Sequence, residues 1–277
     1  MRKSVLSAAV ATAFAIPTLV AAQTPAPAAP PPVTGNMTIA SDYRFRGISQ
    51  TYKGPAIQGG VDYANPSGLY LGNWNSNVSS NLFPGGSGIE MDFYGGWKKS
   101  FGDFGLDLGT IYYYYPNAEV NSTTVAGTAG SSKLDNWEIY VGGSWKWISA
   151  KLNYALDNYF GLDNVQATSF IVNKATGVPI GAHGDSKGTY YFDLTATYPV
   201  NEKLSLIGHW GHLKVKNYSD LDYDDWKVGA TYDLNGWVFG AAYVDTNAKG
   251  DFYYTFGSKG NKETGTSTVV LSVSKTF

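Results

Sequence analysis

The sequence predicts an all-β protein, an up-and-down antiparallel transmembrane β-barrel of about twelve strands. Two observations predict this fold. The chain of 277 residues divides into short segments in which apolar and polar residues alternate, which is the period of a strand with two different faces. The connections between these segments are alternately short and long. This is typical of bacterial outer-membrane barrels, whose short turns face the periplasm and whose long loops face outward.

The composition favours membrane crossing by strands. The chain has 21 Tyr, 8 Trp and 33 Gly, and beyond its N-terminal segment no apolar run approaches the length of a spanning helix. A strand that crosses a bilayer needs only about 9 to 11 residues. Because half of its side chains face the lumen, such a chain is hydrophilic on average, in agreement with a mean hydropathy of -0.19.

The N-terminal residues have the pattern of a secretory signal peptide. Arg2 and Lys3 precede an apolar stretch, and the small residues Ala21 and Ala22 precede the expected cleavage site. The alternative, a spanning helix, is disfavoured by Pro17 and by this small-residue end. We therefore expect a signal peptide at 1–22, a Pro/Ala-rich periplasmic spacer at 23–35 and the outer-membrane barrel at 36–277.

The residue types exclude several kinds of site. The chain has no cysteine, which excludes disulfides, thiolate metal sites and a lipid-modified cysteine anchor. With 20 Lys and Arg against 22 Asp and Glu, it lacks the basic surface that nucleic-acid binding requires. We expect no cofactor and no metal. The acidic cluster Asp220, Asp222, Asp224 and Asp225 departs from a calcium-loop pattern, so we interpret it as a solvated loop, with divalent bridging to lipopolysaccharide as the alternative.

The alternation places the strands in order along the chain. We expect the apolar face of each strand to contact lipid and its charged face to line the lumen, because Lys or Arg in the middle of the bilayer costs about 2 to 4 kcal/mol. In segment 69–75 the outward face stays undecided, and Asn235-Gly236 predicts a tight hairpin turn. The expected strands lie near 36–48, 56–64, 69–75, 88–98, 104–114, 137–146, 148–157, 190–198, 203–213, 225–233, 237–243 and 266–277.

Aromatic residues gather at the ends of these strands. We interpret them as two belts of amphipathic rings at the two headgroup levels of a membrane. A soluble β-sandwich is the alternative, but its core aromatics would be scattered along the strands. The tryptophans of the predicted belts are Trp97, Trp145 and Trp237 beside the short turns and Trp137, Trp210 and Trp226 toward the long loops.

The segment from Ser41 to Gln50 resembles the opening strand of the TorF-type porins, a proteobacterial outer-membrane family. The segments 90–97 and 273–277 are similar to that family too. The resemblance covers about residues 36–277 and implies a barrel with a diffusion pore and no well-defined substrate. In barrels of many kinds a terminal Phe on an alternating strand resembles the signal that the barrel-assembly machinery reads, which here would be Phe277.

The charged residues on the expected inner face are candidate pore-lining residues. We hypothesise that Arg44 and Arg46 on the first strand face carboxylates across a narrow lumen and sort solutes by charge. The alternative is an internal salt-bridge network that fills the barrel. The candidate set is Asp42, Arg44, Arg46, Asp62, Glu90, Asp92, Asp107 and Asp193.

The connection at 158–188 is unusually long and carries apolar residues near 170–172 and 178–180. It either folds inward as a constriction or extends the flanking strands as a hairpin above the membrane. If it formed a further spanning hairpin, the barrel would have fourteen strands.

The sequence predicts an outer-membrane porin-like channel for passive diffusion of small hydrophilic solutes. Its expected partners are outer-membrane lipid and lipopolysaccharide, the barrel-assembly machinery and the solutes, and its oligomeric state stays open. The first alternative is a closed structural or surface-interaction barrel. The second is a barrel-embedded lipid hydrolase. It has little support, because His209 shares a face with Ser205 but no third catalytic residue is evident, so we expect no enzyme.

Overall fold

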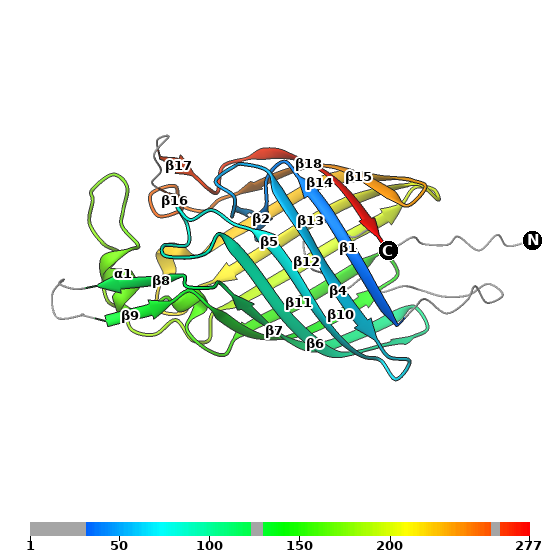
Figure 1. Ribbon diagram of the computed structural model, residues 1–277, viewed down its shortest axis with the longest axis horizontal. Coiled ribbons are helices and arrows are strands. Elements are labelled where there is room, and N and C mark those ends of the chain that lie inside the picture. Colours follow the sequence, from blue (N-terminus) through cyan, green and yellow to red (C-terminus); the bar gives the residue numbers. More distant parts are fainter. Residues whose placement is uncertain (1–31, 123–129, 256–260) are drawn as a thin grey trace, which may run out of the picture.

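The computed structural model describes residues 32–122, 130–255 and 261–277. Within them, twelve strands form a closed antiparallel barrel in which each strand pairs with the barrel strands before and after it in the chain (Figure 1). The last strand pairs with the first, which closes the barrel. In chain order the barrel strands are β1 Val33–Ala40, β4 Ala56–Ala64, β5 Leu69–Asn77, β6 Ile89–Phe101, β7 Phe104–Tyr114, β10 Asn136–Trp145, β11 Ile148–Ala155, β12 Tyr190–Pro199, β13 Leu204–Lys214, β14 Tyr223–Leu234, β15 Trp237–Thr246 and β18 Thr268–Thr276.

The predicted alternation of short and long connections is confirmed. Short turns join the strands at one end of the barrel, where the C-terminus also lies, and the long loops gather at the other end (Figure 1). At the short-turn end, Asn235 and Gly236 both have positive φ, of 55° and 82°, as a two-residue hairpin turn requires. The long loops hold the smaller elements β2 Arg44–Phe45, β3 Ile48–Ser49, β8 Glu119–Ser122, β9 Gly130–Lys133, η1 Tyr159–Gly161, α1 Asn164–Ser169, η2 Ser219–Leu221, β16 Tyr254–Thr255 and β17 Lys262–Glu263.

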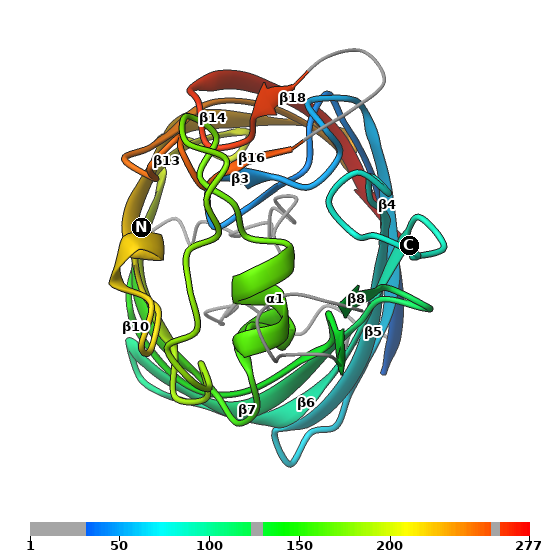
Figure 2. The ribbon, with the colours of Figure 1, turned by 90° about the vertical axis from the view of Figure 1, so that its left-hand side faces the viewer.

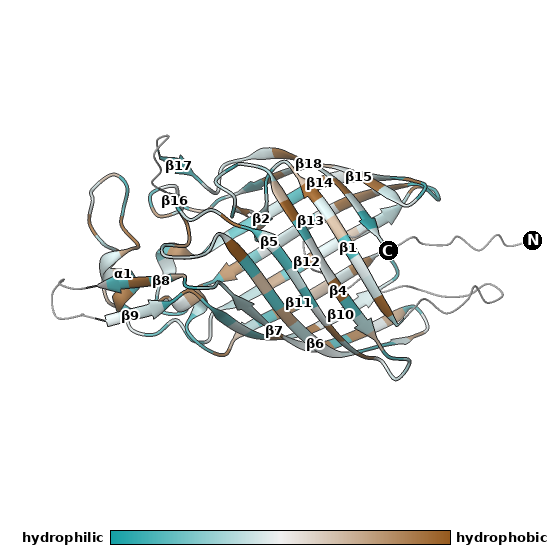
Figure 3. Cartoon of the chain, in the orientation of Figure 1, coloured by the Kyte–Doolittle hydropathy of each residue, from teal (hydrophilic) through white to brown (hydrophobic). Residues whose placement is uncertain are grey.

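Hydrophilic and hydrophobic residues alternate along the barrel strands (Figure 3), and the two faces of the wall differ accordingly. On β10, Glu138 is 1% exposed and points into the barrel, whereas its neighbour Ile139 is 44% exposed on the outside. The undecided segment 69–75 turns Leu71 outward and Tyr70 inward. An outer surface covered by apolar side chains on every side is the surface of a barrel in contact with lipid. Among the described residues, no helix combines the length and the apolar composition needed to cross a bilayer.

One expectation about the strands was wrong, and one open alternative is excluded. The first strand does not run to Ile48, because β1 ends at Ala40, which pairs with Ala56 of β4, and residues 41–55 leave the wall. At its other end β1 includes Val33, which pairs with Tyr63. The segment 158–188 adds no strand to the twelve-stranded wall, so the fourteen-strand barrel is excluded. That segment instead forms η1, α1 and an isolated bridge between Val172 and Pro179.

The tryptophans of the predicted belts lie on the outer wall. Trp137, Trp145, Trp210 and Trp237 are 42 to 47% exposed, and Trp97 and Trp226 are half-buried. Their contact with lipid headgroups stays a prediction. The expected signal peptide and most of the spacer lie outside the described residues.

A charge on the outer wall should destabilise the barrel in a membrane. Val141 lies in the middle of β10 and is 47% exposed, and we expect Val141→Arg to lower the free energy of unfolding by about 2 to 4 kcal/mol. Guanidinium unfolding in liposomes, followed by tryptophan fluorescence, measures the change. Val178→Arg on a loop is the matched control, since Val178 is 58% exposed. Equal stability of the two variants would show that the wall does not face hydrocarbon.

Candidate functional site

The connection between β1 and β4 folds into the barrel as a small hairpin of residues 42–50, which we call the luminal hairpin. Its two strands pair Arg44 with Ser49 and Phe45 with Ile48. Arg46 and Gly47 form the turn with positive φ of 47° and 77°, the arrangement of a type I′ turn. A Cβ atom on Gly47 would lie 2.3 Å from a side-chain carbon of Thr246 on β15 and 2.7 Å from Cβ of Asp225 on β14, so the tip packs tightly against these two strands.

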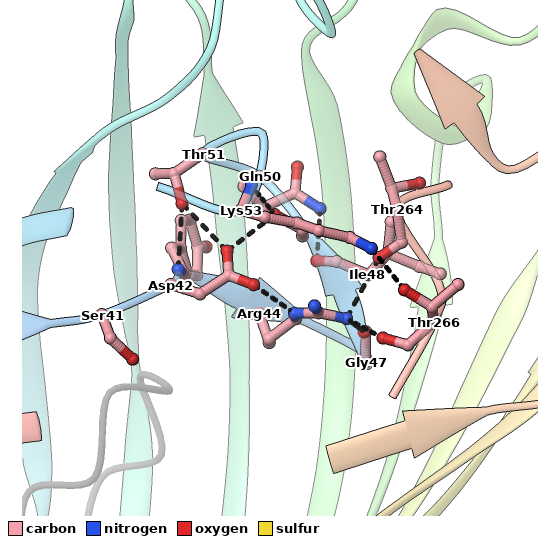
Figure 4. A network of polar contacts seen from close by, with 12 residues as sticks. Ser41, Asp42, Arg44, Gly47, Ile48, Gln50, Thr51, Lys53, Thr264 and Thr266 are labelled. Carbon is pink, nitrogen blue, oxygen red and sulfur yellow. Dashed lines mark hydrogen bonds and ion pairs between the residues drawn. The ribbon is translucent and has the colours of Figure 1, made fainter. Parts of the chain in front are cut away.

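Arg44 fastens the hairpin to the connection that leads into β18 (Figure 4). Its Nε donates to Asp42 Oδ2 at 2.6 Å. Its Nη1 donates to three backbone carbonyls, those of Gly47, Thr264 and Thr266, at 2.9 to 3.1 Å. The side chain is almost fully buried, with 1% of Arg44 exposed. Arg44 therefore joins two segments more than 200 positions apart in the chain.

Asp42 and Tyr43 hold the base of the hairpin. Asp42 Oδ1 accepts hydrogen bonds from Ser49 Oγ at 2.6 Å and from Thr51 Oγ1 at 3.0 Å. The Tyr43 hydroxyl donates to Glu90 Oε1 on β6 at 2.9 Å. Burial and the nearby Glu90 carboxylate raise the pKa of Tyr43 well above its usual value, so the hydroxyl remains a neutral donor.

The side chain of Arg46 connects the tip of the hairpin to the opposite wall. Its Nη2 donates to Glu138 Oε2 on β10 at 2.7 Å, and its Nη1 donates to the Tyr159 hydroxyl of η1 at 3.0 Å. Its backbone carbonyl accepts from the Tyr223 hydroxyl on β14 at 2.8 Å. In the closed strand order β10 lies next to β11, the strand diametrically opposite β1. The Arg46 side chain thus reaches from the hairpin to the far side of the lumen.

The Arg46–Glu138 ion pair is shielded from water on all sides. The two side chains are 5% and 2% exposed. The guanidinium also lies over the ring of Tyr191, 4.4 Å from its centroid, a cation–π contact. Burial alone would lower the pKa of Arg46, but Glu138 and the neighbouring tyrosines raise it overall, so the residue stays charged. Burial raises the pKa of Tyr159 to about 12, which keeps its hydroxyl neutral.

Toward the short-turn end, carboxylates and tyrosines line the inner wall. Asp107 accepts from the Tyr70 hydroxyl at 2.6 Å, and Tyr70 in turn contacts the Tyr140 hydroxyl. The Tyr140 hydroxyl oxygen lies 2.4 Å from where a Cβ of Gly109 would be, so the ring lies flat on the wall where only glycine leaves room for it. These rings cover the inner wall in place of aliphatic side chains.

The structure places all eight candidate residues inside the barrel, but it groups them differently from the hypothesis. Arg44 and Arg46 lie on the luminal hairpin and not on the first strand, and they pair with Asp42 and Glu138. Their expected partners make other contacts, such as Asp107 with Tyr70. The strand-borne candidates Asp62, Glu90, Asp92, Asp107 and Asp193 point inward. Whether these residues line an open pore stays a prediction.

Glu138 is the principal residue outside the candidate set. Its inward position follows from the alternation on β10, but its role as the anchor of Arg46 depends on a hairpin that alternation does not distinguish from a strand. One sequence feature could have indicated the hairpin. Gly47 follows Arg46 between the short segments 44–45 and 48–49, and a glycine at the second turn position is compatible with a type I′ turn.

The residues considered for hydrolysis face the lumen. His209 Nε2 lies 2.9 Å from Asp225 Oδ1, and its Nδ1 lies 3.1 Å from Thr195 Oγ1. The His209 side chain is 9% exposed. Ser205 shares this inner face, so neither residue reaches the lipid-facing rim where a lipid hydrolase would need them.

Each aspartate of the acidic cluster pairs with a different lysine or histidine. Asp220 contacts Lys249, Asp222 contacts Lys214, Asp224 contacts His212, and Asp225 contacts His209. Within the described part of the chain, no group of three His, Cys, Asp or Glu side chains is placed to hold a metal ion.

Comparison with solved structures finds porins among the proteins to which this chain is similar. The KdgM porin matches with a TM-score of 0.49 and 9% identity over 88% of this chain and 99% of that chain. The NanC porin matches with a TM-score of 0.46 and 9% identity over 88% and 98%. OprD from Pseudomonas aeruginosa matches with a TM-score of 0.36 and 11% identity over 88% and 64%. No curated protein sequence matches the chain.

The comparisons leave the TorF-type resemblance as a prediction. The family model described as a bacterial protein of unknown function (Gcw_chp) matches residues 24–277. This match includes the whole barrel, and the chain belongs to the Gcw_chp family.

Proposed function

We propose that the chain is an outer-membrane channel for passive diffusion of small hydrophilic solutes, and that the luminal hairpin is its constriction. The single observation that carries this proposal is the path of the hairpin, which leaves the wall at β1 and ends at Glu138 on the far side. A filter placed across a lumen controls every solute that passes. The inner wall of carboxylates and tyrosine hydroxyls suits hydrophilic solutes.

The orientation and the expected partners belong to the same proposal. The short turns face the periplasm, residues 1–22 act as signal peptide, and the part of 23–35 that precedes β1 acts as spacer. Phe277, which is 67% exposed and whose backbone N–H bonds to Gly35, serves as the assembly signal. The outer wall and its tryptophans contact lipid and lipopolysaccharide. The channel acts without catalysis.

The second candidate is a closed barrel whose function lies in its loops. Close packing at the level of the hairpin favours it. Glu90 is 0% exposed, and Arg44 and Glu138 are each 1% exposed. The two candidates differ in whether the hairpin ever leaves its position.

The interior favours cations. The two arginines of the hairpin are neutralised by Asp42 and Glu138. The remaining candidate carboxylates share the interior with Lys151 and Lys227. Lys151 interacts electrostatically with Asp107 and Asp193, and Lys227 with Asp193 and Asp225. An excess of inward carboxylates attracts cations and repels anions.

Removal of the luminal hairpin should increase conductance. Ala40 and Ala56 are paired neighbours, so a short Gly/Ser turn can replace residues 43–50 and still join β1 to β4. In planar bilayers we expect small steps for the wild type and larger steps for this variant, because the constriction is gone. The control shortens the turn between Val172 and Pro179, which leaves the hairpin in place.

Two other outcomes of this measurement would contradict the proposal. If neither protein conducts above the lipid background, the closed barrel is correct. If both give the same conductance, the hairpin is not the constriction. Liposome swelling with glucose and glycine then tests the size of the solute.

Loss of the Arg44 contacts should loosen the hairpin alone. Arg44→Gln removes the ion pair with Asp42 and the bonds to three carbonyls. We expect faster hydrogen exchange at the amides of residues 42–50, with the barrel strands unchanged, since local opening follows local contacts. Lys174→Gln is the control because the Lys174–Glu263 pair is 40% exposed on both sides. Unchanged exchange at the hairpin would contradict the anchoring role of Arg44.

The charge preference can be measured directly. In a KCl gradient we expect a reversal potential that indicates cation preference, and Asp62→Asn with Asp193→Asn should reduce it. Asp220→Asn on an exposed loop is the control. Anion preference in the wild type, or an equal effect of the control, would contradict the assignment of these carboxylates to the ion path.

A further inference from the structure

A cavity of about 250 Å³ lies at the long-loop end of the barrel, which we call the loop-end chamber. Its walls come from several loops, and the luminal hairpin contributes Phe45 and Ile48 to the lining. The helix α1 crosses the mouth of the barrel beside these elements (Figure 2). The hairpin therefore separates two spaces, the lumen proper and this chamber.

The lining of the chamber carries no charge. Ten of its 22 residues are aromatic, eight are aliphatic, and four, namely Gln50, Asn81, Gln166 and Thr264, are polar and neutral. The inner wall of the barrel contrasts with it, since charged side chains such as Asp107, Glu138 and Lys151 point inward there. A site without any charged group suits an uncharged ligand, because burial of an unpaired charge is costly.

The tyrosines present their rings to the chamber because their hydroxyl groups are engaged elsewhere. The Tyr159 hydroxyl accepts from Arg46 at 3.0 Å, and the Tyr223 hydroxyl donates to the Arg46 carbonyl at 2.8 Å. The Tyr253 hydroxyl donates to the Leu221 carbonyl at 2.6 Å. Three hydroxyls are thus held by the protein, and the carbon surfaces of these rings remain for a ligand.

Aromatic side chains also fix the floor of the chamber. Phe45 packs edge-on against Phe160, with ring centroids 5.6 Å apart, and against Tyr113 at 5.4 Å. Phe160 has a positive φ of 46°, a conformation that is strained for a bulky side chain. Strained residues of this kind cluster at functional sites.

We infer that the loop-end chamber binds a small uncharged aromatic molecule that carries one hydrogen-bonding group. Apolar cavities of roughly 150 Å³ stay dry and accept benzene, so this larger cavity accommodates a substituted ring. Ring faces and edges on several sides favour an aromatic guest over an aliphatic one of equal size. The side-chain nitrogens of Gln50 and Gln166 already donate to the carbonyls of Ile48 and Phe160, so their Oε1 atoms are the acceptors for a donor group such as a hydroxyl.

This site is independent of conductance, because a ligand can occupy the chamber whether or not the hairpin moves. The site differs from the proposed path for hydrophilic solutes, since sugars would lose their hydrogen bonds to water against a wall of carbon.

The test uses the full mature protein in lipid nanodiscs, with phenol as the probe and calorimetric titration as the readout. Empty nanodiscs provide the background. Cyclohexanol matches phenol in size but lacks an aromatic ring, and glucose represents hydrophilic solutes. Val172 and Ile171 both line the chamber, so Val172→Trp and Ile171→Trp each place an indole ring inside it. Val178→Trp is the matched control, since Val178 lies on the same loop, is 58% exposed and does not line the chamber.

We expect saturable phenol binding to the wild type and to Val178→Trp, and affinity weaker by about tenfold or more in both filling variants. Cyclohexanol should bind more weakly than phenol, and glucose should not compete. Heat resistance of the folded barrel on gels verifies that each variant is folded. Phenol binding no greater than in empty nanodiscs, equal affinity of Val172→Trp, Ile171→Trp and Val178→Trp, or equal affinity for cyclohexanol would each overturn the proposal. Because no voltage is applied, a non-conducting barrel that binds phenol refutes the channel and supports the chamber.

Discussion

The buried ion pair between Arg46 and Glu138 is the interaction on which the internal organisation depends. It joins the tip of the luminal hairpin to the wall opposite the strand from which the hairpin leaves. An unpaired guanidinium in this position would be strongly unfavourable, and removal of one partner from a buried pair typically costs about 3 to 5 kcal/mol. The hairpin therefore has one well-defined position, and both spaces inside the barrel take their shape from it.

The tip of the hairpin borders both spaces inside the barrel. Arg46 donates to Glu138 on the inner wall, and its guanidinium also lies 4.7 Å from the centroid of the Phe45 ring. Phe45 in turn packs against Phe160 and Tyr113, so the anchored guanidinium and the uncharged chamber meet at the ring of Phe45. The type I′ turn at Arg46 and Gly47 forms this tip with few residues.

The parts of the molecule that alternation determines could be predicted from the sequence. A period of two distinguishes Glu138 from Ile139 on β10, and the same reasoning assigns the wall, its short turns and its inward charges. The luminal hairpin could not be predicted in this way, because Asp42, Arg44 and Arg46 alternate with aromatic residues in a hairpin as they would in a strand. What separates the two outcomes is contact with distant residues. Arg44 bonds to Thr264 and Thr266, which no local pattern reveals.

The same limit applies to the loop-end chamber. Its lining comes from loops that are remote in sequence, such as Leu82, Phe170 and Tyr253. Each of these residues is an unremarkable apolar residue within its own loop. Only closure of the barrel brings the loops together, so the chamber is a consequence of the topology and not of a motif.

The strength of the anchoring also sets how often a constriction at the hairpin can open. A gap of a few kcal/mol between two conformations leaves the minor one at roughly 0.1 to 10%. Movement of the hairpin requires that Arg46 leave Glu138, Tyr159 and the ring of Tyr191 together, since one guanidinium makes all three contacts. The loss is partly recovered where the released guanidinium meets water or another inward carboxylate. A channel built in this way is closed for most of the time and opens briefly, and its flux depends more on the hairpin than on the width of the barrel.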